Sequence, residues 1–309
     1  GELQREVFGP VLHLVRYARN DLDQLLDQIN ATGYGLTQGV HTRIDETIAR
    51  VVNRAHAGNV YVNRNMVGAV VGVQPFGGEG LSGTGPKAGG PLYLLRLLSQ
   101  RPADALERTF AEADRTSPPD TERRERHLAP LATLQQWAHN QGNLALAGHC
   151  QRFAQETQSG TARTLPGPTG ERNVYTLAPR ARVLCLAQGA DDLLVQTAAV
   201  LASGGTALWP HAHAGLRAKL PTHVQAQVTL QDNALSDGSV ALDAVLHHGD
   251  AHSLQAVCTT LARRPGPIVG VTALQPGAAD IPLERLLIER ALSVNTAAAG
   301  GNASLMTIG

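Results

Sequence analysis

Residues 36–63 read LTQGVHTRIDETIARVVNRAHAGNVYVN, and this stretch decides the fold that we expect for the first part of the chain. Short apolar runs at 36–42 and 59–63 favour strands, whereas residues 45–56 carry apolar side chains at helical spacing. A strand, a helix and a second strand with short connections predict two parallel strands joined by a right-handed crossover.

The segments on either side extend this pattern. Residues 10–17 (PVLHLVRY) are predicted to form another strand, and Asn20 or Asp21 can cap a helix that ends at the glycines of residues 33–35. Residues 68–91 are rich in glycine and follow neither the helical nor the strand period. Loops of this length in compact domains are usually functional or disordered, and the apolar residues within this one favour an ordered loop.

The later part of the chain predicts a second α/β region, at residues 127–309, after a charged linker with two prolines at 101–126. The predicted domains are therefore 1–100, 101–126 and 127–309. The elements expected in the second region are helices at 128–140, 143–155, 191–203 and 252–264, a loop at 160–171, and strands at 174–177, 182–187, 206–209, 244–248 and 267–274. Strands that alternate with helices predict a parallel, doubly wound sheet.

The composition narrows the function classes. The chain has 309 residues, enough for two domains, and its 26 basic and 26 acidic residues give a net charge of zero, so we expect no nucleic-acid site. Three widely spaced cysteines exclude a disulfide framework and favour a reducing compartment, and we expect a cytoplasmic protein. No apolar run reaches the roughly 18 residues of a membrane span. Because the chain opens on Gly1 without a signal peptide, we expect it to be a fragment.

Several local patterns suggest chemistry that their surroundings do not support. Residues 78–83 match GxGxxG, but no helix is expected after them to receive a pyrophosphate. His247, His248 and His252 could bind a metal, yet the first two would point to opposite faces of a strand, so strand-end histidines are the favoured interpretation and no metal site is predicted. Cys185 lies in an apolar strand and is interpreted as a buried structural thiol.

A carboxylate and an aromatic ring lie close together near the start. Glu6 and Phe8 are two positions apart on an extended segment, so both side chains lie on the same face. A carboxylate beside a ring can accept hydrogen bonds from a ribose while the ring packs against nicotinamide. The alternative is an exposed glutamate next to a core phenylalanine.

Several motifs in a consistent order resemble the C-terminal part of an aldehyde dehydrogenase catalytic domain. They are EVFGPV (6–11), YGLTQGVHTR (34–43), GNVYVN (58–63) and QPFGGEGLSGTGPKAGGP (74–91). Residues 63–65, 67–72 and 85–91 are similar to one branch, the L-glutamate γ-semialdehyde (pyrroline-5-carboxylate) dehydrogenases found in bifunctional enzymes of proline utilisation. Residues 170–175 and 293–309 resemble the C-terminal accessory domain of the long forms of these enzymes. The implied fold is a partial aldehyde dehydrogenase catalytic domain followed by a Rossmann-like accessory domain.

The resemblance implies roles for individual residues. Glu6 and Phe8 match the pair that contacts the nicotinamide ribose and ring of NAD. Gly68 and Ala69 match the loop that anchors the substrate carboxylate, and with alanine where relatives often have serine, only backbone N–H groups can serve here. Phe76 matches an aromatic residue that packs along the substrate chain; the alternative is a core residue that anchors the loop.

One departure from the family concerns the reactive centre. The family uses a cysteine nucleophile and a glutamate base, and none of the three cysteines here lies in a matching motif. We therefore expect no catalytic residue in this chain. The nucleophile, the base, the dinucleotide-binding sheet and an FAD-dependent proline dehydrogenase domain should lie upstream of Gly1, in a missing N-terminal part of the same polypeptide, and the fragment alone should be inactive.

The resemblance also implies partners and alternatives. The implied substrate is L-glutamate γ-semialdehyde, and the implied assembly is a homo-oligomer. The accessory domain is expected to act as a lid that seals the passage between two active sites. Residues 293–309 are expected to form an arm that packs into a groove. Two alternatives stay open: a stand-alone aldehyde dehydrogenase with an appended domain, and a non-catalytic assembly module.

Overall fold

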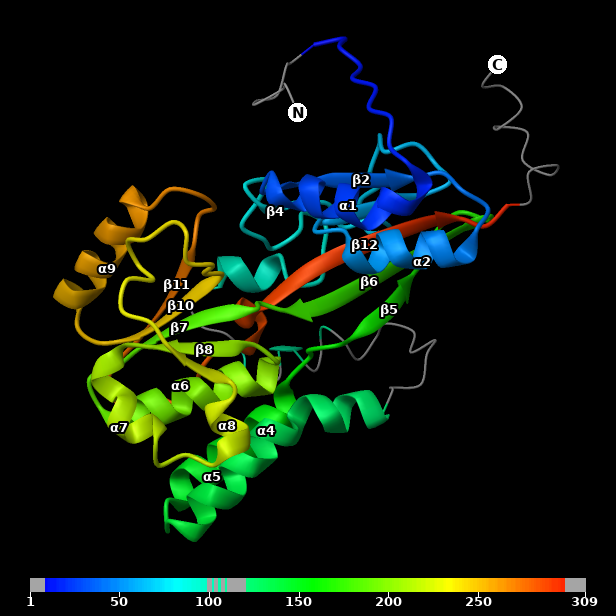
Figure 1. Ribbon diagram of the computed structural model, residues 1–309. Coiled ribbons are helices and arrows are strands. Elements are labelled where there is room, and N and C mark those ends of the chain that lie inside the picture. Colours follow the sequence, from blue (N-terminus) through cyan, green and yellow to red (C-terminus); the bar gives the residue numbers. More distant parts are fainter. Residues whose placement is uncertain (1–8, 99–101, 103–104, 107–108, 110–120, 298–309) are drawn as a thin grey trace.

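The computed structural model describes residues 9–297 except 99–101, 103–104, 107–108 and 110–120, and describes residues 121–125 by their backbone alone. Within this part, two five-stranded sheets organise the chain (Figure 1). A two-stranded antiparallel pair of β1 (Tyr34–Gly35) and β4 (Glu79–Gly80) holds the glycine-rich loop against the end of the first helix.

The first large sheet is entirely parallel, in the order β11-β10-β7-β8-β9. Its strands are β7 (Arg182–Leu186), β8 (Thr206–Trp209), β9 (Val228–Leu230), β10 (Ala244–His248) and β11 (Gly270–Leu274). The helices that accompany it are α4 (Thr121–Asn140), α5 (Leu144–Glu156), α6 (Ala190–Ser203), α7 (Ala214–Arg217), α8 (Thr222–Gln225) and α9 (Ala251–Arg263). The predicted parallel, doubly wound sheet is confirmed.

Alternate side chains of the strands face two helical layers. Cys185 and Leu246 pack into the core formed with α4, α5 and α6, whereas Leu184 and Val245 face the side that α9 covers (Figure 1). This alternation is the period of two that a strand imposes on its side chains. α6 is buried along nearly its whole length because α4 and α5 cover the side that faces away from the sheet.

The second large sheet combines strands from both ends of the chain, in the order β2-β3-β12-β6-β5. Its members are β2 (Thr37–Val40), β3 (Asn59–Val62), β5 (Ala162–Leu165), β6 (Glu171–Pro179) and β12 (Leu287–Asn295). β2, β3 and β12 are parallel neighbours, and β12 and β6 form a long antiparallel pair that runs back to the parallel sheet (Figure 1). Strands on both sides of the predicted 101–126 linker therefore share one sheet.

Two helices cover this mixed sheet. α1 (Leu22–Ala31) and α2 (Asp45–Arg54) pack together, with exposed ion pairs between Arg50 and Asp23 at 2.5 Å and between Arg54 and Asp27 at 2.6 Å. The predicted helix and both predicted strands of residues 36–63 are confirmed. Short 3-10 turns complete the described elements, at Arg19–Asp21, Leu94–Leu97, His211–His213 and Leu283–Leu286.

Three predictions of secondary structure were wrong, and the strand β12 was not predicted. Residues 10–17 form no strand and pair with no described strand, and their apolar side chains are exposed. The end of the predicted linker, from Thr121, is already helical as the first turns of α4. The predicted loop at 160–171 contains β5, which pairs with β6. The whole of β12 was missed because a strand of mixed polarity has a clear assignment only once its two neighbours are known.

All three cysteines are free thiols, as predicted. Cys150 and Cys185 are buried and Cys258 is exposed. No helix in the described part of the chain combines the length and the apolar character needed to cross a bilayer.

Candidate functional site

An exposed glycine-containing turn follows β3. Asn63 begins it in the left-handed region (φ 56°), and its side chain accepts from Thr42 N and donates to Thr42 O, each at 2.9 Å. Gly68 and Gly72 also have positive φ, at 81° and 78°, which glycine adopts without strain. An additional Cβ at either glycine would meet nothing within 4 Å, so both glycines face open space.

Several backbone N–H groups of this turn are free, and two consecutive ones belong to the predicted substrate-anchor residues. Within the described residues, the backbone nitrogens of Gly68 and Ala69 donate to no protein acceptor, whereas Val70 N donates to Gln74 Oε1 at 3.0 Å. Adjacent unpaired N–H groups on an exposed turn can bind an anion such as a carboxylate. The two predicted substrate-anchor residues therefore lie together and have the donors that the role requires.

Phe76 lies at the base of the same loop. Its N–H and C=O both pair with Ala88, at 3.0 and 2.8 Å, and its side chain is half-buried. This geometry fits both predicted roles, the aromatic contact to substrate and the anchor of the loop. Glu6 and Phe8, predicted for NAD, lie outside the described residues.

A buried polar cluster lies beneath the glycine loop. Lys87 is 2% exposed, and its Nζ donates to Asn59 Oδ1 at 3.1 Å and to Gly77 O. Asn59 completes the connection by accepting from Gly77 N at 3.1 Å and donating to Pro75 O at 2.9 Å. Burial lowers the pKa of Lys87 to about 8.

A carboxylate from the far end of the chain meets this lysine. Glu289 of β12 accepts from the backbone N of Lys87 at 2.7 Å and from the Tyr175 hydroxyl at 2.8 Å. Burial raises the pKa of Glu289 and also that of Tyr175. Next to it, Arg290 forms an ion pair with Glu79 at 2.9 Å. These contacts fasten the glycine loop to β6 and β12.

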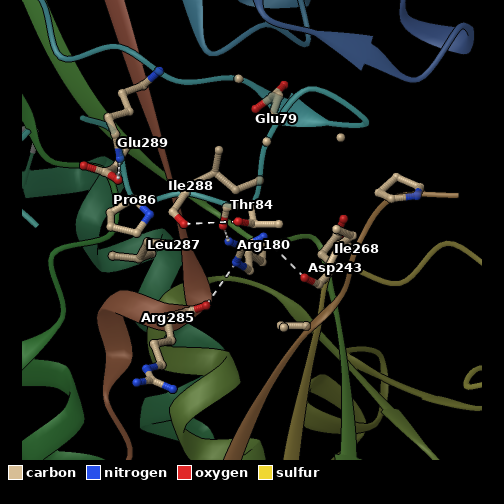
Figure 2. A pocket seen from close by; sticks show the side chains of 18 of the residues that line it. Glu79, Thr84, Pro86, Arg180, Asp243, Ile268, Arg285, Leu287, Ile288 and Glu289 are labelled. Carbon is tan, nitrogen blue, oxygen red and sulfur yellow. Dashed lines mark hydrogen bonds between the residues drawn. The ribbon is translucent and has the colours of Figure 1, made fainter. Parts of the chain in front are cut away.

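A cavity of about 390 Å³ opens beside this cluster, between the loop at 83–86 and the amino ends of β7, β10 and β11 (Figure 2). Arg180 reaches into its centre, where its guanidinium donates to the carbonyls of Arg285 at 3.0 Å and of Thr84 and Asp243 at 3.3 Å each. Burial lowers the pKa of Arg180. By donating to carbonyls of three different segments, this arginine connects the two large sheets.

Ligands of doubly wound sheets bind at the opposite edge, outside the carboxyl ends of the strands where the strand order reverses. Here that point lies between β7 and β10, and His248 fills it: one ring nitrogen contacts Gln196 Nε2 and the other Ala278 O, both at 2.8 Å. The adjacent helix α6 begins with Asp191 and Asp192, whose charge opposes a phosphate. His248 therefore occupies the place where a dinucleotide would bind in a sheet of this kind.

The structure also bears on the GxGxxG pattern and on the histidines that could bind a metal. No helix follows residues 78–83, whose GxGxxG pattern forms β4 and a turn. Among the described residues, no group of three histidine, cysteine or acidic side chains could hold a metal. The buried Lys87, Glu289 and Tyr175 were missed by the sequence analysis. One signal was available: Glu289 lies two positions from both Leu287 and Ala291, which puts its carboxylate on the same face of a strand as two apolar residues.

Residues 2–101, about a third of the chain, match the aldehyde dehydrogenase family. Over its full length, the chain is 60% identical to the bifunctional protein PutA of Salmonella typhimurium. Over 99 residues, 32% of the chain, it is 46% identical to a 1-pyrroline-5-carboxylate dehydrogenase of Staphylococcus aureus, of which it covers 19%.

The chain covers only 23% of the length of that Salmonella relative. A solved structure, that of Proline Utilization A (PutA) from Corynebacterium freiburgense, superimposes with a TM-score of 0.54 at 22% identity. The match covers 91% of this chain and 25% of the other, and it shows that the two share a fold.

Proposed function

We propose that this chain is part of an NAD-dependent L-glutamate γ-semialdehyde dehydrogenase of proline catabolism, in which the turn after β3 binds the substrate carboxylate. The observation that carries the proposal is the pair of free N–H groups at Gly68 and Ala69. A backbone site of this kind recognises a carboxylate without a positively charged side chain. The names of the relatives with 60% and 46% identity support the same substrate class.

The other roles follow from this placement. Phe76, at the base of the loop, packs against the aliphatic part of the substrate. NAD, when bound, accepts the hydride, and Glu6 and Phe8 contact its nicotinamide ribose and ring. Because His248 closes the crevice of the parallel sheet, that sheet does not bind the dinucleotide. The nucleophile, and an FAD-dependent proline dehydrogenase, belong to the remainder of the protein, which acts in the cytoplasm as a homo-oligomer.

Residues 127–309 are proposed to act as an accessory domain that braces the catalytic part and closes a passage. The closed crevice of the parallel sheet favours a structural role over a second catalytic one. β12 pairs with β3, and β3 is the strand that leads into the turn, so the accessory region supports the turn directly.

The test uses the natural full-length protein and follows NAD reduction with glutamate semialdehyde. Ala69→Asp places a carboxylate at the exposed turn and should raise the KM for this substrate at least tenfold, while the KM for propanal, which lacks a carboxylate, stays constant. Ala145→Asp, at an exposed position in the first turn of α5, is the matched control. The proposal is refuted if the wild-type protein does not oxidise the semialdehyde, or if both variants behave alike.

A further inference from the structure

The turn that carries Gly68 and Ala69 is bracketed by two residues that bind the same carboxylate. Arg64 precedes the turn and donates from its guanidinium to Glu171 Oε2 at 2.6 Å. Gln74 follows the turn and donates from its side-chain amide to Glu171 Oε1, also at 2.6 Å. Glu171 begins β6 and is separated from Arg64 by 107 positions in the chain.

Gln74 passes this connection on to the turn itself. Its side chain is 4% exposed, and its Oε1 accepts a hydrogen bond from the backbone N–H of Val70. Val70 directly follows Ala69 in the chain. The backbone also closes here, since Gln74 N donates to Val70 O at 2.8 Å. The orientation of the Gln74 amide, and with it the direction of the Val70 N–H, is therefore determined by the acceptor that Glu171 presents.

Glu171 is itself held firmly from the side of the accessory region. Asn173 donates to Glu171 Oε1 at 2.9 Å and accepts from the Ser293 hydroxyl of β12 at 2.7 Å, and both Asn173 and Ser293 are 2% exposed. On the other side, the Arg64 guanidinium lies 5.2 Å above the ring of Tyr61. Charge-assisted bonds of this length in partly buried positions are stronger than neutral ones and fix geometry.

We propose that Glu171 is a positioning residue for substrate recognition: by binding both ends of the turn, it holds the Gly68 and Ala69 N–H groups in the arrangement that receives the α-carboxylate. This inference rests on the proposed function and adds a specificity role for a residue far from the turn in sequence. Glu171 contacts no substrate atom in this scheme and acts through Gln74 and Arg64.

The test is Glu171→Gln in the natural full-length protein. Glutamine keeps the shape of the side chain but loses the charge that Arg64 needs, and it turns an N–H₂ group either toward Arg64 or toward Gln74 and Asn173. We expect the KM for glutamate semialdehyde to rise about tenfold with kcat within a factor of two, and the kinetics with propanal to stay unchanged. Glu46→Gln, at an exposed position in the first turn of α2, is the control and should change neither.

Two further measurements separate positioning from simple loss of structure. Hydrogen exchange at Val70 N, followed in peptides covering 66–76, should accelerate in Glu171→Gln while peptides from α6 keep their rates. The exchanged pair, Gln74→Glu with Glu171→Gln, restores a bond between these side chains with its polarity reversed, and should recover most of the KM.

The outcomes are distinct. If the wild-type protein does not oxidise the semialdehyde, the proposed function fails and the role of Glu171 in recognition fails with it. If the wild type is active but Glu171→Gln leaves the KM unchanged, or raises it equally for propanal, the function stands and the positioning role is overturned. Unchanged exchange at Val70 overturns the connection through Gln74 whatever the kinetics show.

Discussion

Gly58 lies where three backbone segments meet, and replacing it with alanine tests how tightly the glycine loop is packed. Its N–H donates to Gly35 O and its C=O accepts from Ala291 N, each at 2.9 Å, so the residue is tied to a neighbour on both sides. A Cβ at this position would lie 2.9 Å from the Gly77 carbonyl carbon, closer still to its oxygen, and 2.8 Å from Lys87 Nζ. Ordinary contacts of a Cβ begin at 3.4 Å.

The size of the effect follows from what must move. Gly58 cannot move away without breaking its two backbone hydrogen bonds, to Gly35 and Ala291. Gly77 must therefore move, and its carbonyl loses the Lys87 ammonium. Overpacking in a tight region costs about 1–3 kcal/mol, and a buried hydrogen-bonding group left unsatisfied costs about 1–3 kcal/mol. We therefore expect Gly58→Ala to lower the free energy of unfolding by about 4 kcal/mol, the sum of the middles of these ranges.

The assay is equilibrium unfolding in urea, followed by far-UV circular dichroism. Gly148→Ala is the matched control: Gly148 is exposed within α5, and a Cβ there meets nothing within 4 Å. The control should gain about 0.5–1 kcal/mol, because alanine is the better helix former. A Gly58→Ala protein within 1 kcal/mol of wild type would refute the close-packing argument.

Three further predictions concern the buried polar cluster and the cysteines. The pKa of Lys87 is lowered from 10.5 to about 8 in the folded chain, so above pH 8 the unfolded chain binds more protons than the folded chain does. The contribution of Lys87 to the free energy of unfolding should therefore rise by about 2 kcal/mol between pH 7.5 and 9.5. The measurement is urea unfolding over a pH series, and parallel curves for wild type and Lys87→Met would contradict the prediction. At pH 7, Lys87→Met should lower the free energy of unfolding by about 2 kcal/mol, because Gly77 O loses its donor while the penalty for burying an ammonium is relieved in part. The control is Lys219→Met, at the second lysine, which is exposed; it should leave the free energy of unfolding unchanged. Burial raises the pKa of Cys150 to about 12 and also raises that of Cys185, so a thiol reagent at pH 8 should modify Cys258 alone in the folded chain and all three cysteines in urea; rapid labelling of a second thiol under native conditions would show that the parallel-sheet core opens.

Local sequence patterns predicted the elements of the later region well. The helices and strands predicted between residues 174 and 274 have strong apolar periods and glycine ends, and these signals lie within a few residues of each element. The short elements α7, α8 and β9 in the same range were not predicted. The same local signals misled at residues 10–17, where an apolar run has the composition of a strand but pairs with no described strand. Strand propensity describes how a side chain fits a sheet, so it fails where the sheet is absent.

Some residues of the candidate site could be predicted from the sequence, and others could not. Gly68 and Ala69 could be identified from the motif around them, and the structure adds that their N–H groups are free. Glu171 could not be found from sequence, because a glutamate after a proline- and glycine-rich segment looks like any solvated loop residue. Its role exists only because β6 lies beside β12, which places it within reach of both ends of the turn.

The sequence by itself determined the α/β class, the parallel sheet, the free cysteines and the glycine turn, since each depends on residue type and on spacing within one element. Only the tertiary structure decided that β12 inserts between β3 and β6, and that Glu289 meets Lys87 across 202 positions of the chain. The physical reason is that strands pair through backbone groups that every residue carries, so the choice of partner depends on which faces must be buried together.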